Sequence, residues 1–196
     1  MSEFEYLAVF IAIVAGLSVA QTLSGLVRLV HSRRTMRIDT VHLVWTANLL
    51  VWLINWWWFS FSLVGLEQWT GGYLLYVLLY PTTIYFLLAL LYPSDMPASF
   101  DAEVHLDSNR GWFFGGMLFL GVLEIVDALV KESAGLLGGG EFLFGPTTWY
   151  PAFMFTWLIA SGVAVRSRHR LFNTAFAVLF LVVATWIMIW INQDLP

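Results

Sequence analysis

The 196-residue chain contains no cysteine, and charged residues make up only 11% of it. Without cysteine it cannot form a disulfide, a thiolate metal site or a thiol nucleophile. An average soluble domain has about 25% charged residues and roughly 45 to 50% apolar residues. This chain is 60% hydrophobic, so we do not expect it to fold in water alone.

The sequence also lacks the common motifs for phosphate, dinucleotide, zinc and nucleophile-elbow sites. It shows no nucleophile-base pair, which places an enzymatic function behind the alternatives below. Its net charge of −4 gives no reason to expect nucleic-acid binding. We therefore predict no metal, no cofactor and no nucleic-acid partner. The alternative is a loop metal site made by the four histidines, which are His31, His42, His105 and His169.

Six long apolar runs dominate the chain. About 20 apolar residues cross the ~30 Å of a bilayer core as a helix, and unpaired backbone cannot face lipid. Residues 1–5 include no basic residue, so we expect the first run to be kept and not removed as a signal peptide. The sequence predicts an all-α polytopic membrane protein, a single integral membrane domain over residues 1–196. Its six transmembrane helices, arranged as three out-in-out hairpins, cover about residues 6–30, 41–66, 72–92, 112–130, 147–165 and 171–191.

Basic residues fall on alternate connections between these runs. Cytoplasmic loops carry an excess of Lys and Arg, so both termini are predicted on the non-cytoplasmic side of a plasma or inner membrane. The only basic residue on the other side is Lys131. The arginines of the three basic loops are Arg28, Arg33, Arg34, Arg37, Arg110, Arg166, Arg168 and Arg170. Those at 33, 34, 37, 166, 168 and 170 could bind anionic lipid headgroups, although a role as topology determinants explains them equally well.

Aromatic residues gather near the predicted outer ends of the spans. Amphipathic rings settle at the boundary between lipid and water. We therefore predict that the aromatic residues at these ends lie near the outer interface, namely Trp56, Trp57, Trp58, Trp69, Tyr73, Trp149, Tyr150 and Trp190.

A polar and aromatic seam follows one face of the second run, with residues spaced by three and four. Its members are His42, Trp45, Asn48, Trp52 and Asn55, to which we add Gln21 of the first run and Tyr80 of the third. Amides at this depth are not expected to face lipid, so the seam should face the protein interior or a wet cavity. Either the amides join neighbouring helices, or the seam lines a path for a solute or an ion.

Small residues recur every four positions along the first run. Such a stripe allows another helix to approach closely in lipid. We predict that this helix is central in the bundle or lies at a subunit contact, and that the packing face comprises Ala8, Ala12, Gly16, Ala20 and Ser24.

The fourth run contains the only acidic pair inside an apolar segment, Glu124 and Asp127. Asp127 lies four residues before Lys131 and can pair with it. Glu124 is about 10 Å deeper along the helix axis, at ~1.5 Å per residue. An isolated carboxylate at that depth tends to take up a proton. We predict an ion or proton site at these two acids, and the alternative is a neutral or paired Glu124 that only fixes helix packing.

These observations support two functional hypotheses. The first is a bundle that moves a proton, a cation or a small polar solute through a polar-aromatic interior, with Glu124 as the titrating or ion-binding group. The second is a scaffold, sensor or assembly subunit that does not transport and binds another membrane protein. Either form could be a homo-oligomer.

Overall fold

The structure, a computed structural model, describes residues 3–66, 68–97, 99–136 and 149–190. Within these ranges it is all-α, with seven α-helices and no strand. The helices are α1 (Glu3–His31), α2 (Thr40–Phe59), α3 (Gly71–Leu91), α4 (Ala102–Ser108), α5 (Arg110–Ser133), α7 (Tyr150–Arg166) and α8 (Arg170–Trp190), and a 3-10 helix, η1 (Ser60–Gly65), extends α2. The predicted all-α class is confirmed.

Five of these helices are long and apolar enough to cross a membrane, namely α1, α2 with η1, α3, α5 and α8. The shorter α7 has 17 residues, which span about 25 Å at 1.5 Å per residue. It corresponds to the predicted span 147–165, of which residues 147 and 148 lie outside the described residues. The membrane character is therefore supported for five segments, and the sixth span stays a prediction.

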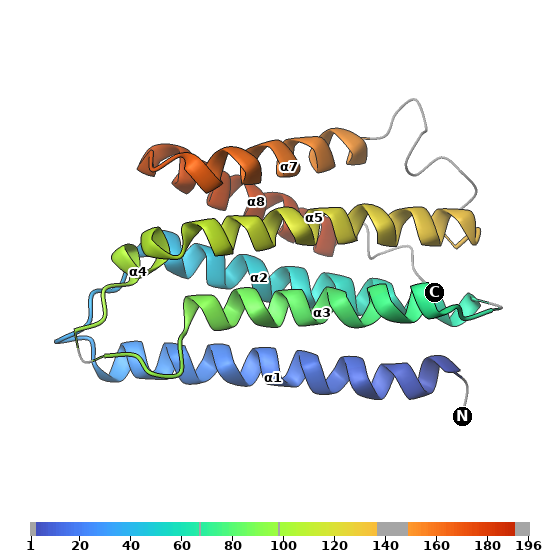
Figure 1. Cartoon of the computed structure of the whole chain (residues 1–196), viewed down its shortest axis with the longest axis horizontal. Coiled ribbons are helices and arrows are strands. Elements are labelled where there is room, and N and C mark those ends of the chain that lie inside the picture. Colours follow the sequence, from blue (N-terminus) through green and yellow to red (C-terminus); the bar gives the residue numbers. More distant parts are fainter. Residues whose placement is uncertain (1–2, 67, 98, 137–148, 191–196) are drawn as a thin grey trace.

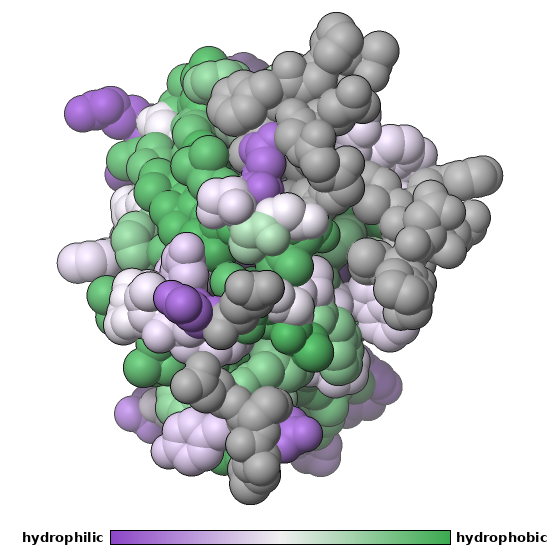
Figure 2. Space-filling model, turned by 90° about the vertical axis from the view of Figure 1, so that its right-hand side faces the viewer, coloured by the Kyte–Doolittle hydropathy of each residue, from purple (hydrophilic) through white to green (hydrophobic). Residues whose placement is uncertain are grey.

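The six long helices lie side by side along one axis (Figure 1). The main contacts join α5 to α7, α2 to α8, α1 to α3, and α3 to α5. As Figure 1 shows, α1 lies at one edge of the bundle and α7 at the opposite edge. Figure 2 views the bundle from the end that carries the start of α1, where hydrophobic side chains predominate and hydrophilic ones are scattered.

The three arginine-bearing connections meet at one end of the bundle, on the left in Figure 1. Arg170, at the start of α8, bonds to Asp39 at 2.9 Å and to Glu103 at 2.5 Å. Three of the six arginines predicted to meet lipid headgroups, Arg37, Arg168 and Arg170, therefore have carboxylate partners within the chain. Arg33, Arg34 and Arg166 are exposed at the same end.

One helix was not predicted from the sequence. In α4, the Asp101 side chain accepts hydrogen bonds from the backbone N–H groups of Glu103 and Val104, at 3.0 and 3.1 Å. An aspartate that caps in this way satisfies N–H groups that the first turn leaves without partners. At seven residues, α4 is too short to give a hydrophobic period, which is why composition alone assigns this segment to a loop.

Side chains from three elements cap the carboxyl end of α3. His105 bonds to the Leu90 carbonyl at 2.8 Å, His42 to the Leu91 carbonyl at 2.9 Å, and Gln21 donates to the Tyr92 carbonyl at 2.7 Å. The last carbonyls of a helix have no partner inside it, and here they need one because the surrounding protein is apolar. Both histidines must donate their Nε2–H, since a carbonyl only accepts. No group of three or more metal-ligating side chains occurs in the described ranges.

The small-residue stripe of α1 does not pack within the chain. Ala12, Gly16, Ala20 and Ser24 are exposed, and Ala8 is only partly buried. The buried face of α1 carries Leu7, Ile11, Ser18, Thr22, Gly25 and Leu29 instead. The prediction that α1 is central is therefore wrong. The small residues follow one face of the helix, and this face is exposed, whereas a different face of α1 packs against α3. A subunit contact along the stripe stays a prediction.

Gly25 permits the closest approach between α1 and the end of α3. A Cβ atom at this position would overlap the Tyr92 ring. That ring is fixed, because it is buried, bonds through its hydroxyl to Thr46 at 2.8 Å and lies edge-on to His42.

We predict that Gly25→Ala destabilises the folded protein by about 1–3 kcal/mol, the usual range for overpacking. The measurement is denaturant or thermal unfolding in detergent. The matched control is Gly16→Ala on the same helix, where an added Cβ meets nothing within 4 Å. Equal stability of the two variants would show that the Gly25 contact is not tight in the protein.

Candidate functional site

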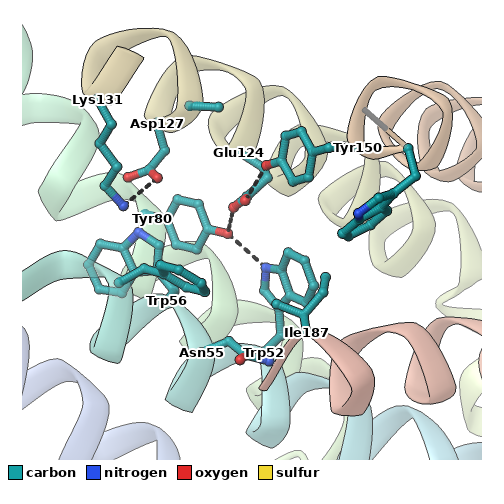
Figure 3. A pocket seen from close by; sticks show the side chains of 12 residues that line it. Trp52, Asn55, Trp56, Tyr80, Glu124, Asp127, Lys131, Tyr150 and Ile187 are labelled. Atoms are coloured by element: carbon teal, nitrogen blue, oxygen red, sulfur yellow. Dashed lines mark hydrogen bonds and ion pairs between the residues drawn. The ribbon is translucent and has the colours of Figure 1, made fainter. Parts of the chain in front are cut away.

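A cavity of about 50 Å³ lies between α2, α3, α5, α7 and α8 (Figure 3). Its lining residues belong to the parts of these helices that are remote from the arginine-bearing connections. It is lined by Trp52, Asn55, Trp56, Phe59, Tyr80, Glu124, Asp127, Ala128, Lys131, Trp149, Tyr150 and Ile187. One ordered water needs roughly 10–15 Å³ of such space. The cavity can therefore hold water or a small ion, but no larger solute.

Glu124 is held by two tyrosine hydroxyls from different helices. Tyr150, at the start of α7, donates to its Oε1 at 2.6 Å, and Tyr80 in α3 donates to its Oε2. Trp52 donates its indole N–H to the Tyr80 oxygen at 2.7 Å. Because an indole nitrogen only donates, this bond turns the Tyr80 O–H toward the carboxylate. Figure 3 shows the chain of bonds running from Trp52 through Tyr80 and Glu124 to Tyr150.

The predicted pairing of Asp127 with Lys131 is present. The Lys131 Nζ lies 2.6 Å from Asp127 Oδ2, and the two side chains are only 2% and 7% exposed. The ammonium also lies over the Phe59 ring, 5.9 Å from its centroid. The sequence predicts Lys131 on the non-cytoplasmic side near the outer boundary, and the structure turns its side chain inward, where it is buried against Asp127 and the Phe59 ring.

Three polar atoms around the cavity have no hydrogen-bond partner among the described residues. They are Asp127 Oδ1, Asn55 Oδ1 and Trp56 Nε1, two acceptors and one donor. Buried polar groups without a protein partner are normally bonded to ordered water. Their presence places polar atoms in the wall of a mainly aromatic cavity, which is therefore not a purely apolar packing void.

The seam residues divide between this cavity and the helix contacts. Trp52, Asn55 and Tyr80 line the cavity together with both acids. Asn48 donates to the Ala177 carbonyl at 2.8 Å, and Asn55 donates in the same way to the Ala184 carbonyl at 2.9 Å. The two bonds are one heptad apart on each helix, so they clamp α2 against a parallel α8. His42 and Gln21 belong to the cap of α3, far along the bundle from Glu124.

Trp45 is the centre of an aromatic block in the middle of the bundle. Its ring lies 5.3 Å from Phe113, 5.6 Å from Phe114 and 5.1 Å from Phe176, edge-on in each case. Phe180 extends the block toward the cavity, 4.8 Å from the Trp157 ring. These five rings are buried, so the block separates the cavity from the arginine end of the bundle.

At the arginine end a charged hollow of about 350 Å³ lies beyond this block. The charged groups that line it are Asp39, Glu103, Asp107, Arg110, Arg168 and Arg170. Arg110 is buried and donates to the Ala164 carbonyl at 3.2 Å, to the Ser167 carbonyl, and to Asp107 at 2.6 Å. It thereby caps the end of α7, a role that its position in a basic loop did not reveal.

Two site residues were assigned to the membrane interface by the sequence analysis. Trp56 and Tyr150 are buried, and Trp56 stacks on Tyr80 with ring centroids 4.7 Å apart. The interface assignment of these two residues is wrong, because their side chains face the protein interior. Tyr150 bonds to the carboxyl group of Glu124, and Trp56 stacks on the tyrosine that makes the other bond to it. Trp57 and Trp58, by contrast, are exposed.

Comparison with known proteins finds no matching family model, no similar curated protein and no similar solved structure. The geometry of the site is therefore the basis for the function of this chain proposed below.

We predict that Tyr80→Phe destabilises the protein by about 1–3 kcal/mol, because it leaves the buried Trp52 N–H without an acceptor and removes a donor from Glu124. Unfolding in detergent measures this loss. Tyr85→Phe is the matched control, since Tyr85 is partly buried on the same helix but lies outside the cavity. If both variants unfold at the same denaturant concentration, the bond chain through Tyr80 does not hold the site together.

Proposed function

We propose that this chain is a six-helix integral membrane protein that moves protons or small cations, with Glu124 as the group that takes up and releases them. The observation that carries the proposal is the position of Glu124, which lies between two tyrosine hydroxyls and borders a mainly aromatic cavity that contains buried polar atoms. Ionisable groups inside membrane helices mark ion or proton pathways more often than they serve packing alone.

The hydrogen bonds of Glu124 suit both of its protonation states. When the carboxyl group is ionised, each of its oxygens accepts a bond from a hydroxyl. When it is protonated at Oε1, it can donate to the Tyr150 oxygen, because a phenol both donates and accepts. The contact between Glu124 and Tyr150 therefore persists through a cycle of proton uptake and release.

The aromatic block favours a gated mechanism over an open pore. Buried rings around Trp45 fill the bundle between the cavity and the charged hollow. At the arginine end, Arg170 ties α8 to Asp39 and to α4. Transfer across the bundle thus requires the rings to move, and these ion pairs to rearrange with them.

The proposed topology has six spans with both termini on the non-cytoplasmic side, and α7 is the shortest span. It is supported by the three arginine-bearing connections, which share one end of the bundle (Figure 1). The Glu124 cavity lies toward the other end, so in this topology it is closer to the outside.

A non-transporting scaffold is the second functional hypothesis. It is favoured by α1, which lies at the edge of the bundle with Ala12, Gly16 and Ala20 facing outward. A stripe of this kind accepts another helix in lipid, from a second copy or from another protein. Purification in mild detergent distinguishes the two functions, because a scaffold should bring a second polypeptide in stoichiometric amount.

Single cysteines test the orientation, and the cysteine-free sequence makes this direct. We expect a membrane-impermeant maleimide to label Ser133→Cys in intact cells and to label Thr35→Cys only after lysis. Both positions are exposed and lie at opposite ends of the bundle. The reverse labelling pattern would invert the proposed topology.

A proton flux assay in proteoliposomes tests the function. We expect Glu124→Gln to reduce flux by about tenfold or more, since glutamine cannot exchange a proton at neutral pH. Glu132→Gln is the matched control, because Glu132 directly follows Lys131 on α5 and lies outside the cavity lining. Unchanged flux in correctly folded Glu124→Gln would remove Glu124 from the mechanism.

A further inference from the structure

We infer that Lys131 is a tethered counter-ion that occupies the cation position of the Glu124 cavity and restricts the site to protons. This inference rests on the proposed function and narrows its substrate class. It assigns to Lys131 a role in specificity, and it predicts that removing the ammonium turns the cavity into a metal-binding site.

Without Lys131, the cavity has the features of a site for a hard cation. Glu124 and Asp127 lie one turn apart on α5 and both line the same cavity. One further oxygen atom, Asn55 Oδ1, is buried there without a partner among the described residues. Carboxylate and amide oxygens are the ligands that calcium and similar ions take in proteins. Two carboxylates in a confined space also give the net negative charge that attracts such an ion.

Lys131 supplies a positive charge in that position. Its Nζ bonds to Asp127 Oδ2 at 2.6 Å, and its side chain is only 2% exposed. The Phe59 ring, 5.9 Å from the ammonium, adds a favourable aromatic contact on one side. Figure 3 shows the lysine reaching from the last turn of α5 back toward Asp127, above Trp56. A second cation entering the cavity would meet this ammonium directly.

The charges that remain match a proton. Lys131 balances Asp127, which leaves the cavity with one uncompensated acid, Glu124. A proton on Glu124 neutralises it and needs no extra room, because it lies between the carboxyl oxygen and the Tyr150 hydroxyl. The site therefore accepts a proton without displacing any group, whereas a metal ion would have to displace Lys131.

The test measures metal binding directly in purified protein in detergent, with terbium(III) as the probe. Terbium binds carboxylate oxygens and emits when a nearby tryptophan is excited, and Trp52 and Trp56 line the cavity. We expect Lys131→Gln to bind terbium at least about tenfold more tightly than the wild type, because the repelling charge is gone. Millimolar calcium should displace the terbium and raise the melting temperature of this variant.

Two control variants test whether the effect depends on the positive charge of Lys131 and on the carboxylate of Glu124. Lys131→Arg keeps the positive charge and should bind no more terbium than the wild type. Adding Glu124→Gln to Lys131→Gln removes one carboxylate and should abolish the gain. A folded Lys131→Gln protein that binds terbium no better than the wild type would overturn the inference.

The wild type supplies a second measurement in case Lys131→Gln does not fold. Tryptophan-sensitised terbium emission should be the same in the wild type and in Glu124→Gln. Sodium or calcium should not compete with the proton flux of the wild type. Emission that depends on Glu124 in the wild type, or flux carried by sodium, contradicts the inference. Terbium binding is read without any transport, so failure of the proposed function and failure of this inference give different results.

Discussion

The apolar composition of most of this bundle is the constraint on which its structure depends. A polar group in an apolar environment costs free energy unless another group in the same chain bonds to it. The chain meets this requirement at helix ends and at helix crossings. The amides of Asn48 and Asn55 bond to carbonyls of α8, and Arg110 bonds to carbonyls at the end of α7. These polar contacts determine which helices are neighbours, because uniform apolar surfaces do not distinguish one packing partner from another.

The Glu124 site obeys the same constraint in a different way. Its acids and their partners come from four helices, with Trp52 on α2, Tyr80 on α3, Glu124 on α5 and Tyr150 on α7. Bonding across so many elements makes the site a junction of the bundle. A change in the bonds of Glu124 therefore affects α3 and α7 together, and in the proposed function this would couple proton binding to the positions of these two helices.

Much of the fold could be predicted from composition and spacing, because long apolar runs and arginine-bearing loops are local signals. The Asp127–Lys131 pair was also predictable, since residues four apart on a helix are neighbours. The partners of Glu124 were not, because pairing between helices depends on contacts such as Gly25 with Tyr92 that no local pattern encodes. Trp56 and Tyr150 show the limit clearly. Their position near helix ends is equally typical of interface residues and of residues in a buried site. Only the three-dimensional structure, in which both side chains are buried, distinguishes the two cases.

The peripheral position of α1 has a consequence for how the protein is made. Among the described helices α1 is synthesised before α3, yet its principal contacts are with α3, which begins about forty residues after α1 ends. Until α3 has been synthesised, Gln21 lacks the Tyr92 carbonyl to which it donates, and the face around Gly25 and Leu29 lacks its principal packing partner. Docking of α1 is thus deferred until the third long helix is available, and the growing chain passes through a stage in which α1 is not yet anchored.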